Sequence, residues 1–319
     1  MLQYRGSESP SKGILYSLLG GFLLTANDAV LKWLTDGYPV GQLLFIRGLF
    51  VLAAISIIIF KSGGIGIVRV NSFCGQFQRA GFAFASGFLF LTGVSYLPLA
   101  DAIAITFAGP LFMTALAGPM LGEPVGWRRW AAVGVGFFGV IVMVRPSGGA
   151  LQWAAIFPLL ASLAGALRDI TTRRISVNES SLSIFFFSTV SIILLGLFTL
   201  PFGWATLRFE DFALMGLSGL LVGGAHFILI ERFRWAEAAL LAPFKYVSMI
   251  WAVIFGFVIF GDLPDVWTWA GAIFIVVCGL YIAYRETQVT KSSATTLAII
   301  FRALICFIFG LLDETVIFC

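Results

Sequence analysis

The sequence predicts an all-α polytopic membrane protein with ten transmembrane helices, arranged as two inverted five-helix repeats. Three observations predict this class: the apolar composition, the length of the apolar blocks and the side on which lysine and arginine gather. Of the 319 residues, 60 % are hydrophobic and 11 % are charged, whereas a soluble globular protein carries roughly 25 % charged residues. A chain this apolar would have no water-facing surface in water, so the lipid bilayer is its expected partner.

The apolar residues fall into blocks of about 20 residues, the length that crosses roughly 30 Å of hydrocarbon as a helix. A signal peptide is the alternative interpretation of the first block, but no small-residue cleavage site follows it. The predicted spans are 13–33, 41–60, 80–97, 102–122, 130–144, 152–170, 182–201, 212–230, 238–260 and 267–284.

The basic residues orient these spans, because loops on the cytoplasmic side of a membrane carry an excess of lysine and arginine. With the N-terminus in the cytoplasm, 14 of the 20 basic residues lie inside and only Lys32, Arg145 and Arg208 lie at outside ends. One missed span would reverse the side assigned to every later loop, and the excess of basic residues on the inside would disappear. We therefore expect ten spans, a cytoplasmic N-terminus and, as location, the inner membrane of a bacterium.

Two segments of the chain repeat at an offset of about 140 residues. A Gly-acid pair, a proline and a tryptophan follow Leu121 and again follow Phe260, and an acid with a base four residues later occurs at Asp28 and Lys32 and again at Asp169 and Arg173. Five spans is an odd number, so the second copy enters the membrane from the opposite side. Inverted repeats of this kind build secondary transporters, whose site lies near the midplane between the halves.

With these features the chain resembles the EamA branch of the drug/metabolite transporter superfamily. The segments that carry the resemblance are Leu99-Ala100-Asp101-Ala102, Leu121-Gly122-Glu123, 134–145, Ala236-Glu237-Ala238, 242–246, Gly261-Asp262 and 279–285. The family usually has glutamate where Asp262 stands. The resemblance implies a tail at 1–12, a first repeat at 13–145, a second repeat at 146–285 and a C-terminal tail at 286–319. It also implies a carrier of small organic solutes, such as riboflavin, S-adenosylmethionine or amino-acid metabolites.

Charged residues inside the membrane are functional candidates, because a charge at bilayer depth is unfavourable unless it is paired or hydrated. Asp28 and Lys32 share one helix face near the outer end of the first span, and Asp169 and Arg173 share one near the inner end of the sixth. We hypothesise that these pairs mark two gates of an alternating-access carrier. The alternative is a pair of interfacial salt bridges whose long side chains reach water.

Further candidates lie deeper in the spans. Arg47 is about 10 Å below the outer surface at 1.5 Å per residue, where it can reach Asp28 or an anionic group of the substrate. From the inner side, Lys245, Tyr246 and His226 are expected to line the inner half of the cavity. The alternative roles are a structural counter-ion for Arg47 and a hydrogen-bonded packing residue for His226.

Aromatic residues in the fourth and ninth spans suit a planar ligand by stacking. The expected members of this group are Phe107 and Trp251, together with Tyr246. Riboflavin is the substrate that this aromatic content favours, and S-adenosylmethionine or an amino-acid metabolite is the alternative.

No enzyme, metal site, cofactor site or nucleic-acid site is expected. The chain has one histidine and four cysteines without metal-ligand spacing, and it lacks the common motifs of metalloproteases, serine hydrolases and phosphate-binding loops. A channel or a non-transporting membrane protein is the remaining alternative. In the C-terminal tail, 297–312 is short for a span and is expected to lie on the membrane surface or without fixed structure. An eleventh span is the alternative.

Overall fold

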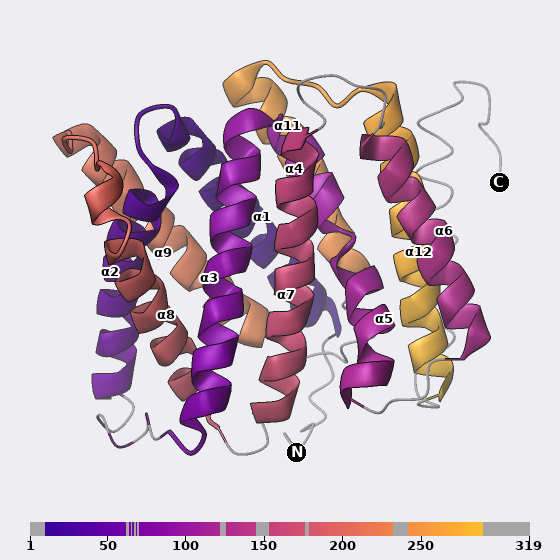
Figure 1. Cartoon of the computed structure of the whole chain (residues 1–319), viewed down its shortest axis with the longest axis horizontal. Helices are drawn as coiled ribbons and strands as arrows, with labels where there is room; N and C mark the ends of the chain where they lie inside the picture. Colours follow the sequence, from indigo (N-terminus) through magenta and orange to yellow (C-terminus); the bar gives the residue numbers. More distant parts are fainter. Residues whose placement is uncertain are drawn as a thin grey trace.

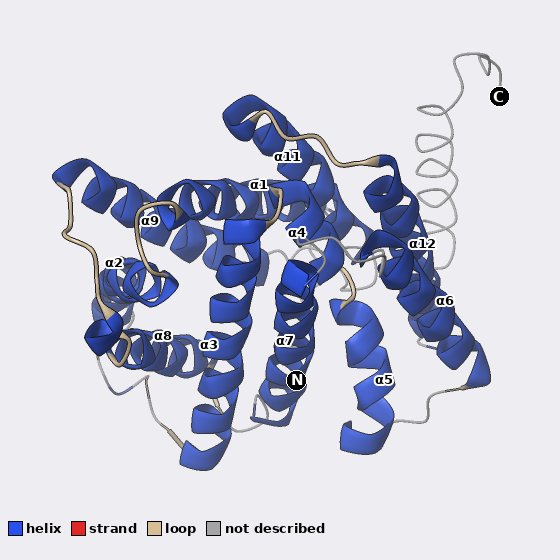
Figure 2. Ribbon diagram, turned by 45° about the horizontal axis from the view of Figure 1, so that its top comes forward, coloured by secondary structure: helices blue, strands red, loops and turns tan. Residues whose placement is uncertain are grey.

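The computed structural model describes residues 10–289, apart from 62–63, 65, 67, 69, 122–125, 145–152, 176–178 and 232–241. All regular structure in these described ranges is helical. Of the predicted C-terminal tail at 286–319, residues 286–289 belong to a helix, and residues 290–319, like the turn at Glu123, lie outside the described residues. Figure 1 shows the helices running side by side along a common direction, and Figure 2 shows the same bundle tilted.

The longer helices in chain order are α1 (Pro10–Thr35), α2 (Val40–Lys61), α3 (Phe73–Tyr96), α4 (Leu99–Thr106), α5 (Gly109–Leu121), α6 (Trp127–Val144), α7 (Ile156–Ile175), α8 (Ser181–Leu197), α9 (Phe209–Glu231), α11 (Ser248–Phe255) and α12 (Val266–Val289). Short 3-10 turns lie at Trp153–Ala155, Leu200–Phe202 and Ala242–Val247, and a π turn follows α11 at Gly256–Phe260.

Seven of the described helices are long and apolar enough to cross a membrane, and Ser248–Phe260 and Val266–Tyr281 are shorter apolar helices. The prediction of an all-helical, multi-pass membrane protein is thus confirmed, while the count of ten spans stays a prediction. Helix α3 is not among the seven, because Gln76, Gln78 and Arg79 make its first two turns polar.

The predicted helix at 102–122 is divided between α4 and α5. Pro110 has no backbone N–H to donate to the carbonyl of Thr106, and its ring clashes with that carbonyl. Phe107 and Ala108 instead donate to Ala104 and Ile105, three residues back, and Leu111 donates to Ala108. The chain therefore tightens and bends just before the proline.

The most extensive helix contacts join the part of the chain before residue 145 to the part after residue 152. They are the pairs α3–α7, α6–α12, α1–α9 and α2–α8. Helices α6 and α12 lie together at one edge of the bundle in both views (Figure 1, Figure 2). They meet through glycines: a Cβ on Gly271 would lie 2.5 Å from the carbonyl oxygen of Gly139.

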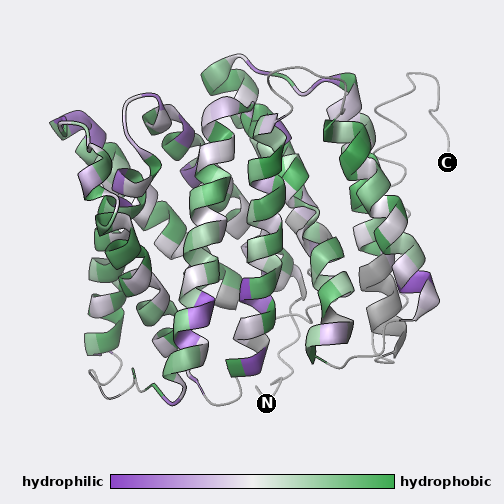
Figure 3. Cartoon of the chain, in the orientation of Figure 1, coloured by the Kyte–Doolittle hydropathy of each residue, from purple (hydrophilic) through white to green (hydrophobic). Residues whose placement is uncertain are grey.

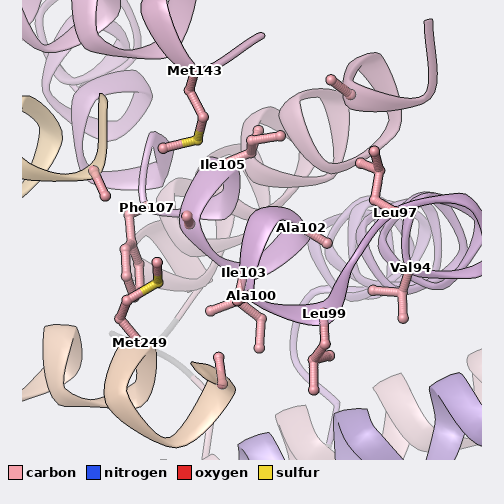
Figure 4. Close-up of a cluster of buried hydrophobic side chains, with 14 of the residues drawn as sticks. Val94, Leu97, Leu99, Ala100, Ala102, Ile103, Ile105, Phe107, Met143 and Met249 are labelled. Carbon is pink, nitrogen blue, oxygen red and sulfur yellow. The ribbon is translucent and has the colours of Figure 1, made fainter. Parts of the chain in front are cut away.

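The largest apolar cluster surrounds α4, with side chains from α3, α6 and α11 packed onto it (Figure 4). Hydrophobic residues make up most of each helix (Figure 3), and many of the large ones are exposed on the outside of the bundle. Trp33, Trp127, Trp267 and Trp269 are exposed near helix ends. Tryptophan at these positions is typical of the interface between lipid and water.

Candidate functional site

At the C-terminal end of α1, Lys32 joins three segments. Its Nζ atom donates to the carbonyl oxygen of Leu97 at 2.9 Å and to Oδ2 of Asp262 at 3.3 Å. It also lies over the ring of Phe260, 4.7 Å from the ring centroid. Lys32 therefore makes its ion pair across the bundle with Asp262, and not with Asp28 one turn earlier on its own helix.

A second set of contacts joins the loops at the same end. The hydroxyl of Tyr38 donates to Asp211 at 2.7 Å and accepts from the backbone N–H of Arg208 at 3.2 Å. The N–H of Arg208 lowers the pKa of this phenol, but the hydrogen bond and the charge of Asp211 raise it, and the net pKa lies above its ordinary value. Nε2 of Gln42 donates to the carbonyl oxygen of Ala205, and Oε1 of Gln42 accepts from the N–H of Ala205.

Asp28 lies inside the bundle and is held by a short chain of hydrogen bonds. Nδ2 of Asn27 donates to Oδ1 of Asp28 at 3.0 Å, and Oδ1 of Asn27 accepts from the hydroxyl of Ser218 at 2.7 Å. Asn27 and Ser218 are buried, while Asp28 is half-buried. The carboxylate is therefore oriented by α9 through Asn27.

Arg47 on α2 interacts electrostatically with Asp28. Leu43, Leu44 and Val51, which share its helix face, are at most 5 % exposed, so Arg47 points into the bundle. Its guanidinium donates no hydrogen bond to any other residue that the structure describes. The structure thus brings two predicted site residues, Asp28 and Arg47, close to each other.

At the opposite end of the bundle, Arg79 of α3 joins α7 and α8. Its Nε donates to the hydroxyl of Thr172 at 2.7 Å, and its Nη1 donates to the hydroxyl of Ser188. Arg168 forms an ion pair with Asp169 at 2.8 Å, and the charges of both act on Arg79. Asp169 therefore lies among arginines of two helices. The side chain of Arg173, its predicted partner, is outside the described set.

His226 on α9 belongs to the same end of the bundle. Its ring stacks on Phe185 at 5.4 Å, and Nδ1 lies 2.8 Å from the carbonyl oxygen of Val222. A carbonyl oxygen only accepts, so the hydrogen is on Nδ1, and in the neutral ring Nε2 is an acceptor. Arg47, Arg79 and Arg168 are all close enough to act on this ring electrostatically.

The predicted aromatic group lies apart from these charges. The ring of Tyr246 packs edge-on against Phe107 at 5.2 Å, and both rings belong to the apolar cluster around α4. Trp251 packs edge-on against Phe22 of α1, also at 5.2 Å. The side chain of Lys245 is outside the described set, so its predicted place beside His226 stays a prediction.

Three polar residues at this end of the bundle, Glu179, Gln76 and Arg79, were not among the site residues predicted from the sequence. Glu179 is buried and accepts the backbone N–H groups of Asn71 and Ser72, both at 2.7 Å, next to the first turn of α3. Gln76 is 3 % exposed, and neither amide atom has a hydrogen-bond partner among the described residues. Residues 71–79 are polar enough to be interpreted as a loop, and Glu179 lies in the loop predicted between 170 and 182. Their low hydropathy is the reason that Gln76, Arg79 and Glu179 were not considered.

The described residues contain no group of three potential metal ligands. Comparison with known proteins places the chain in a family. The model of the EamA-like transporter family matches residues 11–145. The S-adenosylmethionine uptake transporter of Rickettsia prowazekii is 30 % identical over 200 residues, which are 63 % of this chain and 68 % of that protein. The chain belongs to the EamA-like transporter family.

Other relatives of this EamA-like chain match along most of its length. The S-adenosylmethionine uptake transporter of Rickettsia felis is 27 % identical over 86 % of this chain and 94 % of that protein. The riboflavin transporter of Rhizobium johnstonii is 28 % identical over 88 % of this chain and 94 % of that protein. The prediction of a small-metabolite transporter, and not an enzyme, is confirmed by this family membership.

A solved structure supports the fold. This crystal structure covers 88 % of the EamA-like chain and 99 % of its own, with a TM-score of 0.61 and 16 % sequence identity.

Proposed function

We propose that this EamA-like transporter moves a small organic metabolite across a bacterial inner membrane by alternating access between two inverted halves, 13–145 and 146–285. The proposal includes ten spans with a cytoplasmic N-terminus. One observation carries it: charged and polar side chains of both halves meet inside an otherwise apolar bundle. Asp28 and Arg47 come from the first half, and Ser218 and His226 come from the second.

The pairing of helices supports the inverted arrangement. An offset of about 140 residues, read from the sequence, relates α1 to α7, α2 to α8, α3 to α9 and α6 to α12. Under this exchange the contact α1–α9 becomes α7–α3, and the contact α2–α9 becomes α8–α3; all four contacts are present. The contacts α2–α8 and α6–α12 are unchanged by the exchange, because each joins a helix to its own counterpart. Such a twofold relation provides two states of similar energy that face opposite sides.

Two substrate classes follow from the relatives. S-adenosylmethionine is transported by the named Rickettsia proteins, and riboflavin by the named Rhizobium protein. The interior charges favour S-adenosylmethionine, because a neutral ring system would leave Asp28 and Arg47 without ionic partners. The aromatic pairs, which favoured riboflavin in the sequence, lie in the apolar cluster around α4 and beside Phe22.

The test is transport by purified full-length protein in liposomes. We expect saturable uptake of radiolabelled S-adenosylmethionine that is accelerated by unlabelled substrate on the opposite side. Flux that does not saturate and shows no such acceleration would indicate a channel. Riboflavin is measured in parallel, and labelling of cysteines introduced in the loops reports whether the N-terminus is cytoplasmic.

A further inference from the structure

We infer that Asp28 and Arg47 form a recognition pair for a zwitterionic α-amino-acid group, with the substrate carboxylate on Arg47 and the substrate ammonium on Asp28. This inference rests on the proposed transport function and deepens it, because it names the chemical class that the interior binds.

The first argument is the unused hydrogen-bonding capacity of Arg47. A guanidinium carries five N–H donors, and none of them is bonded to another residue in the described part of the chain. Lys32 and Arg79, two other cations of the described helices, differ in this respect. Lys32 is bonded to Leu97 and Asp262, and Arg79 is bonded to Thr172 and Ser188.

The second argument is the way in which Asp28 is held. Asn27 donates to Oδ1 only, and Oδ2 has no hydrogen bond among the described residues. Ser218 fixes the amide of Asn27 from α9, so the carboxylate keeps one direction. An oriented carboxylate with one unused oxygen is suited to accept from an ammonium group.

The third argument is that the two charges attract each other without joining. Their helices α1 and α2 contact each other and the two charges act on one another, yet no ion pair joins them. Both are half-buried and lie on inward faces of adjacent helices. A group that carries both charges on one carbon atom satisfies each residue at once.

Other ligand classes fit less well. A neutral flavin would desolvate both charges without compensating either one, which is unfavourable. A dianion would gain Arg47 but would be repelled by Asp28. A cation without a carboxylate would gain Asp28 and be repelled by Arg47.

The test combines ligand pairs with protein variants in liposomes. S-adenosylhomocysteine carries the amino-acid group, and methylthioadenosine lacks it but keeps the same nucleoside and a thioether. We expect the first compound to compete with S-adenosylmethionine uptake at least tenfold better than the second. Arg47→Gln and Asp28→Asn should each weaken competition by S-adenosylhomocysteine by about tenfold to a hundredfold, as expected when a charge-assisted hydrogen bond is lost. The weak competition by methylthioadenosine should stay unchanged.

Arg208→Gln and Asp36→Asn are the matched controls, since both residues are exposed and lie outside the bundle interior. Arg47→Lys keeps the charge and should recover part of the competition. If Arg47→Gln does not fold, the comparison of the two ligands on the wild-type protein decides whether the amino-acid group is recognised, and Asp28→Asn tests the site.

Equal competition by both ligands overturns the inference and leaves the transport function in place. Saturable riboflavin transport that is unchanged in Arg47→Gln and Asp28→Asn, and insensitive to S-adenosylhomocysteine, also overturns the inference and leaves the transport function in place. Absence of saturable flux for every probe contradicts the transport function itself and removes the inference with it.

Discussion

Lys32 and Asp262 are 230 positions apart in the chain, and their Nζ and Oδ2 atoms lie 3.3 Å apart at one end of the bundle. The lysine side chain is 14 % exposed and the aspartate side chain is 41 % exposed. Because Lys32 also holds the carbonyl oxygen of Leu97, a single ammonium group ties α1 to the start of α4 and to the turn before α12. In the proposed topology this end is the outer one, and we propose that this contact holds it closed.

Removing this contact should open the outer end more often. We expect Lys32→Gln and Asp262→Asn to raise several-fold the rate at which an impermeant maleimide labels a cysteine placed at Leu99, which is fully buried next to this contact. The background has the four native cysteines replaced. Thermal stability should change little, because partly exposed ion pairs contribute about 1 kcal/mol or less. Arg208→Gln is the control, and labelling rates equal to it in both variants would show that the pair does not seal this end.

Asp169 is the corresponding candidate at the other end of the bundle. Its carboxylate is half exposed and lies near Arg168 and Arg79. We expect Asp169→Asn to slow uptake severalfold in liposomes while the yield and elution profile of the protein stay normal, because the exposed carboxylate contributes little to folding. Normal uptake in both Asp169→Asn and Asp28→Asn would rule out the gate hypothesis for these pairs.

Gln76 is a buried amide without a hydrogen-bond partner among the described residues. A buried polar group left in this state is unfavourable by about 1–3 kcal/mol, so Gln76→Leu should raise the thermal unfolding temperature in detergent. Gln78→Leu on the exposed side of the same turn is the control and should leave it unchanged. A lower unfolding temperature for Gln76→Leu would mean that the amide is bonded in the membrane-embedded protein.

The contact of α6 with α12 depends on the absence of side chains. A Cβ at Gly271 would lie 2.5 Å from the carbonyl oxygen of Gly139 and 2.9 Å from Cβ of Met143. We expect Gly271→Ala to destabilise the protein by about 1–3 kcal/mol, the usual effect of overpacking. Gly134→Ala on α6 meets no atom within 4 Å and should be neutral or slightly stabilising. Equal melting curves for the two variants would contradict this packing.

The helical, multi-pass class of the fold follows from the sequence, because bilayer thickness sets the length of the apolar helices. Side-chain partners do not follow in the same way. The four-residue spacing of Asp28 and Lys32 places them on one face, but each interacts with a residue outside its own helix: Asp28 with Arg47 of α2, and Lys32 with Asp262 in the turn before α12. A spacing rule describes one helix alone, whereas these contacts depend on how helices from distant parts of the chain are placed.

The start of α3 shows a second reason. The chain from Asn71 to Arg79 is too polar to be recognised as part of a span. From Phe73 onward this segment is helical, and Ser72 caps the helix. Glu179 accepts hydrogen bonds from the N–H groups just before the helix, and Arg79 donates to hydroxyl groups on α7 and α8. Polar residues at a membrane helix end are stabilised by distant partners, which hydropathy does not report.

The cross-pairing of helices also has a consequence for biosynthesis. Asn27 and Arg79 enter the membrane early in translation, but their partners Ser218, Thr172 and Ser188 are made only later. The first half therefore reaches the bilayer with polar groups that it cannot satisfy within itself, and it must wait for the nascent second half, shielded by the insertion machinery or by water. Expressed alone, it should be a substrate for membrane proteases, and it should be rescued when the second half is supplied as a separate polypeptide.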